Sequence, residues 1–152
     1  FAEAADVTRE RVAHAGRGGA ARQSALNNHV WALLCGVEAG QLDLDSTEEE
    51  ISTTLQQAQR LASTGTVLAG THALHHLIHG RLAEAAEHAR GSLLWHRTRQ
   101  ARADDLVTLA EALAGLGQHD ESASAMSEAL TLSPDNPRLA GARANLEDMG
   151  VS

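Results

Sequence analysis

Apolar residues recur along this chain at intervals of three and four, the spacing that places side chains on one face of an α-helix. Leu26, Val30, Leu33 and Val37, followed by Gly40, make one clear stripe. No segment shows the alternation of apolar and polar residues that is typical of a half-buried strand. The pattern therefore predicts an all-α protein. We expect helices over roughly 1–15, 26–37, 46–62, 66–79, 82–97, 103–116, 119–132 and 137–149.

Two of the expected helices begin with capping signals. Ser46 followed by Glu49 is a capping-box pattern, in which each side chain accepts a hydrogen bond from the other residue's backbone N–H. The acidic residues 48–50 then lie in the first turn, where the helix dipole favours negative charge. Asn136-Pro137 predicts another helix start, because Asn caps and Pro has no N–H to leave unsatisfied at the first helical position.

Composition strengthens the helical prediction and excludes several chemistries. Ala, Leu, Glu and Arg are abundant, and these residues, like the Gln residues of the chain, lose little on entering a helix. All twelve basic residues are Arg, and the chain has no Tyr. Schiff-base lysines, phosphate-loop lysines and tyrosine acids are therefore excluded. The near absence of Lys, Phe, Tyr and Ile also indicates a GC-rich bacterial genome, which suggests an actinobacterium.

Charge and cysteine content limit the partners and the compartment. The net charge of -8 repels a phosphate backbone, so we expect no nucleic-acid binding, and we interpret Arg97, Arg99 and Arg102 as a solvated edge. Cys35 is the only cysteine, which favours the reducing cytoplasm. No apolar run approaches the roughly 20 residues that cross a bilayer. Because the sequence begins at Phe1 without a signal-peptide pattern, we expect a fragment of a longer protein.

The stretch 103–136 has large and small residues at the spacing of a two-helix repeat. Its marked positions are Leu106, Leu109, Ala110 and Leu113 on the first helix, and Ser122, Met126 and Ala129 on the second. Gly117 falls at the turn, and Pro134 stops the second helix because proline cannot continue one. Small residues at facing positions let two helices approach closely, while large residues fill the space between them.

This spacing resembles the tetratricopeptide repeat family, whose unit is a helix–turn–helix of 34 residues. Weaker copies are expected at about 24–63 and 66–99. We expect 137–149 to be a solvent-facing capping helix, because Arg143 stands where a repeat has a large apolar residue. The resemblance implies a single domain over 1–152, in which antiparallel helix pairs stack as a right-handed α-solenoid.

The resemblance also implies a function. The first helices of such repeats line a concave groove that binds a peptide or a helix of a partner. Here the positions facing that groove are Val67, Gly70, Leu74, Leu77, Ile78, Asp104, Val107 and Glu111. The groove lacks the Lys, Arg and Asn set with which some family members clamp a terminal carboxylate. We expect a non-catalytic protein-interaction scaffold without a cofactor.

The segments 60–65 and 79–86 are similar in style to the repeat regions of large actinobacterial signalling ATPases, including LuxR-type regulators with an ATP-binding domain and antibiotic-regulatory proteins. Such repeats receive an inducer or a partner and restrain a neighbouring effector domain. This similarity implies a regulatory module whose partner is another protein or another domain of its own parent chain.

One helix carries a concentration of histidines: His72, His75, His76 and His79. They form two pairs at i,i+4, the spacing at which two imidazoles on a helix can share one metal ion. His88 or His96 is a candidate third ligand. Our primary interpretation has no metal and places His72 and His76 at large core positions. The alternative is a sensor of a metal or small ligand that uses this helix face.

Overall fold

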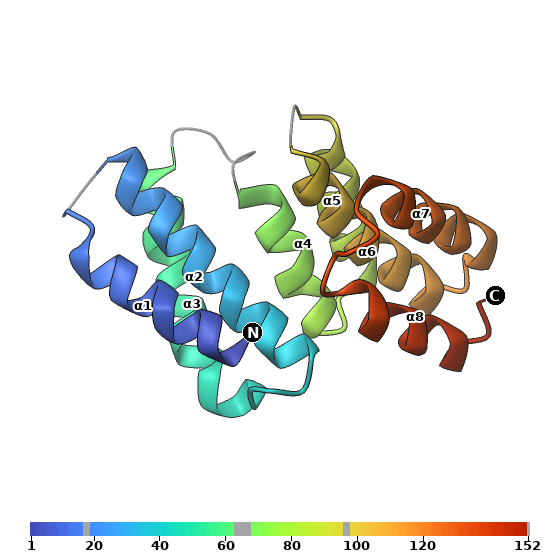
Figure 1. Ribbon diagram of the computed structural model, residues 1–152, viewed down its shortest axis with the longest axis horizontal. Coiled ribbons are helices and arrows are strands. Elements are labelled where there is room, and N and C mark those ends of the chain that lie inside the picture. Colours follow the sequence, from blue (N-terminus) through green and yellow to red (C-terminus); the bar gives the residue numbers. More distant parts are fainter. Residues whose placement is uncertain (17–18, 63–67, 96–97, 152) are drawn as a thin grey trace. The chain divides into compact units, whose positions relative to one another are not determined.

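The computed structural model of the chain describes residues 1–16, 19–62, 68–95 and 98–151. These residues form eight helices and no strand, which confirms the all-α prediction. Val67, His96 and Arg97, which the sequence analysis considered, lie outside the described residues. The helices are α1 (Ala2–His14), α2 (Ala20–Glu38), α3 (Leu44–Leu61), α4 (Ala69–Ile78), α5 (Leu82–Leu93), α6 (Arg99–Gly115), α7 (His119–Leu132) and α8 (Leu139–Asp148) (Figure 1).

The predicted capping box at Ser46 is wrong. Helix α3 begins at Leu44, and its N-cap is Asp43, whose carboxylate accepts a 2.9 Å hydrogen bond from the backbone N–H of Ser46. Ser46 is therefore inside the helix, where its hydroxyl donates to the Asp43 carbonyl at 3.0 Å. A carboxylate satisfies an N-terminal N–H and also interacts favourably with the helix dipole, so Asp43 is the better cap.

Other helix starts also differ from the expectation, and α2 begins at Ala20 rather than near residue 26. Helix α6 begins at Arg99, four residues early, because the Thr98 hydroxyl caps it by accepting from the backbone N–H of Ala101 at 3.2 Å. Helix α8 begins at Leu139 rather than at Pro137. There the Asn136 side chain accepts from the backbone N–H of Arg138 at 2.9 Å, which closes a turn before the helix instead of capping it.

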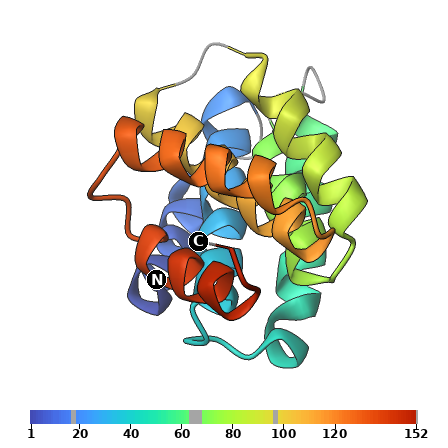
Figure 2. The same ribbon diagram turned by 90° about the vertical axis from the view of Figure 1, so that its right-hand side faces the viewer.

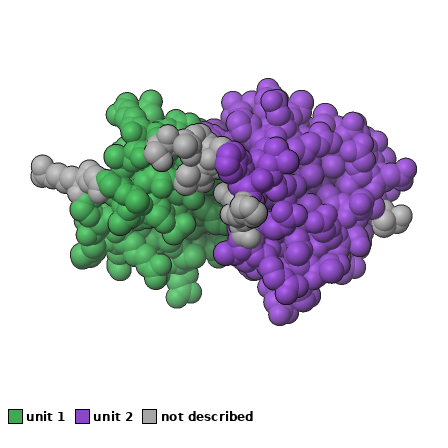
Figure 3. Space-filling model, turned by 90° about the horizontal axis from the view of Figure 1, so that it is seen from above, with its two compact units in different colours: residues 1–71 green, residues 72–152 purple. Residues whose placement is uncertain are grey.

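Contacts divide the chain into two compact units, residues 1–71 and 72–152, and the division falls within α4 (Figure 3). In the first unit, α2 packs against both α1 and α3. The largest fully buried side chains of this unit include Leu26, Val30, Leu33, Leu34, Ile51 and Leu68. The division of the chain into three repeats within one domain stays a prediction.

Helix α6 is the centre of the second unit, where α5, α7 and α8 all pack against it (Figures 1 and 2). Every residue from Asp105 to Ala114 is buried, as in a helix that is enclosed on all sides. The helix approaches α5 closely at Gly115, where a Cβ would lie 2.7 Å from Leu82 Cδ1. Neighbouring helices of this unit are therefore packed as pairs.

Helices α6 and α7 approach each other at two small residues. The hydroxyl of Ser122 on α7 donates a 2.7 Å hydrogen bond to the backbone carbonyl of Ala110 on α6, and both residues are fully buried. The turn between the helices contains Gly117 at φ 77°, a left-handed conformation that glycine adopts without strain. The small positions of the 103–136 repeat pattern thus lie at a close helix–helix contact.

The Ser122 contact leads to a prediction about stability. Ser122→Leu should lower the free energy of unfolding by about 2–3 kcal/mol, because a larger side chain forces α6 and α7 apart. Ser122→Ala should cost only about 1 kcal/mol, the worth of one hydrogen bond. Urea denaturation would measure both, with Ser124→Leu on the exposed side of α7 as the control. Equal losses for Ser122→Leu and Ser124→Leu would contradict the close contact.

Candidate functional sites

The groove positions predicted on α4 are largely buried. Gly70 and Leu74 are buried, while Leu77 and Ile78 are partly exposed. Leu77 also packs against the core of the second unit, together with Ala73. Whether these residues bind a partner stays a prediction.

The groove positions predicted on α6 contact the chain itself. Val107 is fully buried, and Glu111 is only 6% exposed. The Asn145 side chain of α8 donates to Glu111 Oε1 at 2.9 Å, and Asn136, just before α8, donates to Asp104 Oδ1 at 2.7 Å. A partner would reach Glu111 only if α8 moved away, whereas Asp104 is partly exposed.

Arg138, the residue just before α8, is bonded to the same part of α6. It is 4% exposed, and its guanidinium donates to the Asp104 carbonyl at 2.9 Å and to the Thr108 hydroxyl at 3.1 Å. The guanidinium also lies 3.8 Å from Glu111 Oε2, so opposite charges are buried together. The sequence gives no sign of this role of Arg138, because a lone arginine after a proline has no recognisable pattern.

Removing this buried cation should be costly. We expect Arg138→Ala to lower the free energy of unfolding by about 3 kcal/mol, because it deprives a buried carboxylate of its nearby positive charge and removes two hydrogen bonds. Arg143→Ala changes an exposed arginine within α8, so it is the matched control and should change stability by less than about 0.5 kcal/mol. Thermal and urea unfolding would compare the two variants. Similar losses would show that Arg138 does not anchor α8.

A groove of about 300 Å³ lies between α7 and the C-terminal end of the described chain. Its apolar lining comes from Ala123, Met126, Leu130, Leu146 and Val151, and its polar lining from Ser127, Arg143 and Glu147. Arg143 and Glu147 are exposed and carry opposite charges. The sequence predicted only a solvating cap here. That prediction rested on Arg143, because the residues that surround it in space cannot be identified from the sequence.

The histidines of α4 fall into two structurally different pairs. His72 and His76 face α5, where the His76 ring stacks on that of His88 with centroids 4.9 Å apart and planes at 14°. The His72 and His88 rings are 5.7 Å apart. Burial lowers the pKa of both His72 and His76, and the positive charge that His88 can carry lowers them further. These imidazoles are therefore neutral at neutral pH and lie partly buried beside α5, while the interpretation that they bind no metal stays a prediction.

His75 and His79 form the other pair. Their ring centroids are 4.5 Å apart with planes at 57°, and His79 Nδ1 lies 2.8 Å from the His75 carbonyl oxygen. A carbonyl only accepts hydrogen bonds, so this contact fixes the proton of the neutral His79 ring at Nδ1. The structure therefore gives the two i,i+4 pairs different surroundings.

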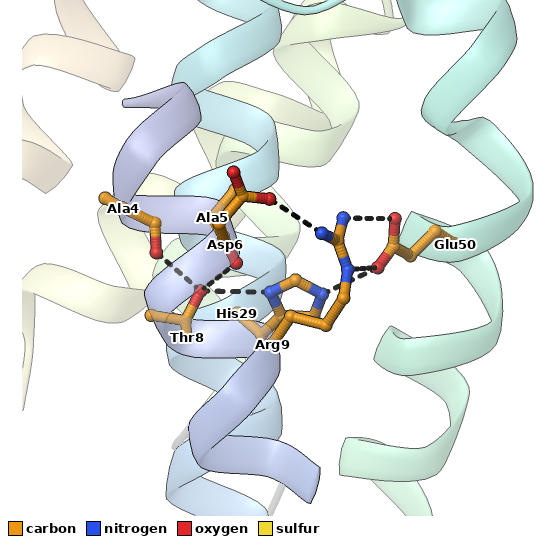
Figure 4. A network of polar contacts seen from close by, with 7 residues as sticks. All are labelled: Ala4, Ala5, Asp6, Thr8, Arg9, His29 and Glu50. Carbon is orange, nitrogen blue, oxygen red and sulfur yellow. Dashed lines mark hydrogen bonds and ion pairs between the residues drawn. The ribbon is translucent and has the colours of Figure 1, made fainter.

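A polar network joins the three helices of the first unit (Figure 4). Thr8 Oγ1 of α1 lies 3.0 Å from His29 Nδ1 of α2, and His29 Nε2 lies 2.9 Å from Glu50 Oε1 of α3. Arg9 donates to both carboxylate oxygens of Glu50, at 2.8 and 3.0 Å. The order hydroxyl, imidazole, carboxylate is that of a nucleophilic relay, although sequence analysis gave no indication of it.

The surroundings of this network favour a structural role. The Arg9 guanidinium, hydrogen-bonded to Glu50, lowers the pKa of that carboxyl to about 2, and His29 adds to the effect. A carboxylate neutralised by arginine is a poor partner for an imidazole that must gain a proton. The Thr8 hydroxyl is also 2.9 Å from the carbonyls of Ala4 and Ala5, within its own helix. The network clamps α1, α2 and α3 together.

The lowered pKa of Glu50 predicts a pH dependence. A folded-state pKa below the ordinary 4.5 means that the contribution of Glu50 to stability is present above pH 4.5 and is lost as the pH falls towards 2. Glu50→Gln should cost about 1 kcal/mol at neutral pH, a modest value because the side chain is 34% exposed. It should flatten the acid limb of the curve of stability against pH.

Glu49→Gln is the matched control for this experiment, because Glu49 is the exposed neighbour in the same helix. Urea denaturation at a series of pH values would measure all three proteins. If Glu50→Gln and Glu49→Gln give superimposable curves, the clamp does not contribute to stability.

Comparison with protein-family models, curated proteins and solved structures gave no match to this chain. Among the described residues, no helix is long and apolar enough to cross a membrane. The tetratricopeptide resemblance therefore rests on the residue spacing of 103–136.

Proposed function

We propose that this chain is a non-catalytic protein-interaction module of the tetratricopeptide type, which binds a peptide or helix of a partner in the groove between α7 and the C-terminal residues. The observation that carries this proposal is the groove itself, with its apolar lining and its volume of about 300 Å³. A groove of this kind suits the apolar face of an amphipathic helix, whose side chains at i, i+3 and i+4 serve as anchors.

The chemistry of the groove supports a polypeptide partner. Met126 and Leu130 lie one helical turn apart on α7, and methionine adapts its shape to different apolar partners. Arg143 and Glu147 stand on α8 one turn apart and offer charges of both signs to the polar side of a bound helix. No metal or cofactor is needed for such binding.

The spacing of α6 and α7 supports the solenoid part of the proposal. The repeat positions Ala110 and Ser122 meet at a close helix contact, as stacked helix pairs require. In this proposal α8 follows the α6–α7 pair in the stack, and the groove lies between α7 and α8. The proposed partner is a protein, or another domain of a larger bacterial regulator in the cytoplasm.

The proposal predicts that filling the groove blocks binding. Helical peptides selected against the whole chain from a random display library should bind Ser127→Trp at least about tenfold more weakly than the unaltered chain, because a bulky side chain would occupy the groove. Ser127 is exposed, so the change should not disturb the core. Fluorescence anisotropy of labelled peptides would measure the dissociation constants.

Ser124→Trp is the matched control, because Ser124 is exposed on the same helix and does not line the groove. It should bind the selected peptides as the unaltered chain does. If the peptides bind both variants equally, or if no helical peptide is selected, the groove is not a docking site.

A further inference from the structure

The two histidine pairs of α4 share the same spacing in the sequence, so the sequence treats them as equal candidates for metal binding. Their ring geometry separates them. A metal ion lies about 2.0–2.1 Å from a ligating imidazole nitrogen and close to the plane of the ring, where the nitrogen lone pair points. Two imidazoles share an ion only if their planes allow those lone pairs to converge.

His76 does not meet this requirement with its neighbour on α5. The His76 and His88 rings are stacked nearly face to face, with an angle of 14° between their planes. Lone pairs of nearly parallel stacked rings lie in separate, parallel planes and do not converge on one ion. This part of the cluster is a packing arrangement in which the imidazoles fill the space between two helices.

The rings of His75 and His79 lie close together without being stacked. Their centroids are only 4.5 Å apart with the planes tilted by 57°, and one ring nitrogen of each lies within 4.8 Å of the other. Both side chains are partly exposed, which leaves a path for an ion and for water ligands. Two histidines one helical turn apart are also the arrangement with which a helix presents two ligands to zinc.

The hydrogen bond of His79 supports a ligand role. Its Nδ1 donates to the His75 carbonyl at 2.8 Å, so Nε2 is the nitrogen that carries the lone pair in the neutral ring. Metal-binding histidines commonly donate their second ring N–H to a backbone carbonyl, which orients the imidazole. The backbone carbonyl of His75 therefore orients the ring of His79.

One contact opposes metal binding. Arg81 Nη2 lies 3.5 Å from His75 Nδ1, and a guanidinium carries a positive charge that disfavours a nearby cation. Arg81 is exposed, and a contact of that length is weak, so the side chain can turn into solvent at little cost. The contact with Arg81 lowers the affinity of His75 and His79 for a metal ion but does not prevent binding.

We propose that His75 and His79 together bind a divalent transition-metal ion of the zinc, nickel or copper class, with water completing the coordination. The site is independent of the peptide groove. Metal binding to α4 can therefore be measured separately from partner binding.

Isothermal titration of the full chain with zinc chloride, at a pH of about 7.5 where imidazoles are deprotonated, tests the proposal. His79→Ala and His75→Ala should each weaken zinc binding at least about tenfold, and the double variant should abolish it. Arg81→Ala should tighten binding, because it removes the opposing charge. Far-UV circular dichroism would confirm that each variant keeps its helices.

His76→Ala and His119→Ala are the controls, the first from the stacked pair and the second an exposed histidine on α7. Both should bind zinc as the unaltered chain does. The proposal is overturned if zinc does not bind, if His76→Ala weakens binding as much as His79→Ala, or if the double variant still binds normally. Because Ser127→Trp does not touch this site, failure of the groove and failure of the metal site remain distinguishable.

Discussion

Helix α6 is buried along its length from Asp105 to Ala114, and a helix without a solvent face must satisfy every polar side chain inside the protein. Three of its buried residues, Asp105, Thr108 and Glu111, are polar or charged. Arg138 and Asn145 reach this buried surface from α8 and the turn before it. The attachment of α8 therefore follows from the polar residues that α6 buries.

The arrangement of α7 depends on the same helix through a different interaction. Ser122 and Ala110 bring the two backbones close enough for a hydroxyl-to-carbonyl hydrogen bond. Helix α7 is attached to α6 through small residues, and α8 is attached to it through a charge network. The apolar groove lined by Met126 and Leu146 lies between these two helices. The two helices that line the proposed docking site are thus both attached to α6.

The polar network of the first unit and the histidines of the second show how surroundings decide chemistry. Thr8, His29 and Glu50 have the order of a catalytic relay, but Arg9 neutralises the carboxylate and turns the group into a clamp between helices. The i,i+4 pairs of α4 have identical spacing, yet His76 is stacked on His88 of α5 while His75 and His79 lie against each other with tilted rings. In both cases residue type and spacing are insufficient without the orientation of the side chains.

The sequence by itself determined the all-α class and most helix positions, because a 3.6-residue period, helix-forming composition and glycine breaks all act locally. It also placed Ala110 and Ser122 at facing small positions. The Asp43 cap of α3 is a local contact that the Ser46 pattern misassigned. Only the tertiary structure decided that Arg138 contacts α6 and that Val107 and Glu111 are buried. Those outcomes depend on which surfaces meet in space, and contacts between residues 30 or more positions apart leave no periodic signal in the chain.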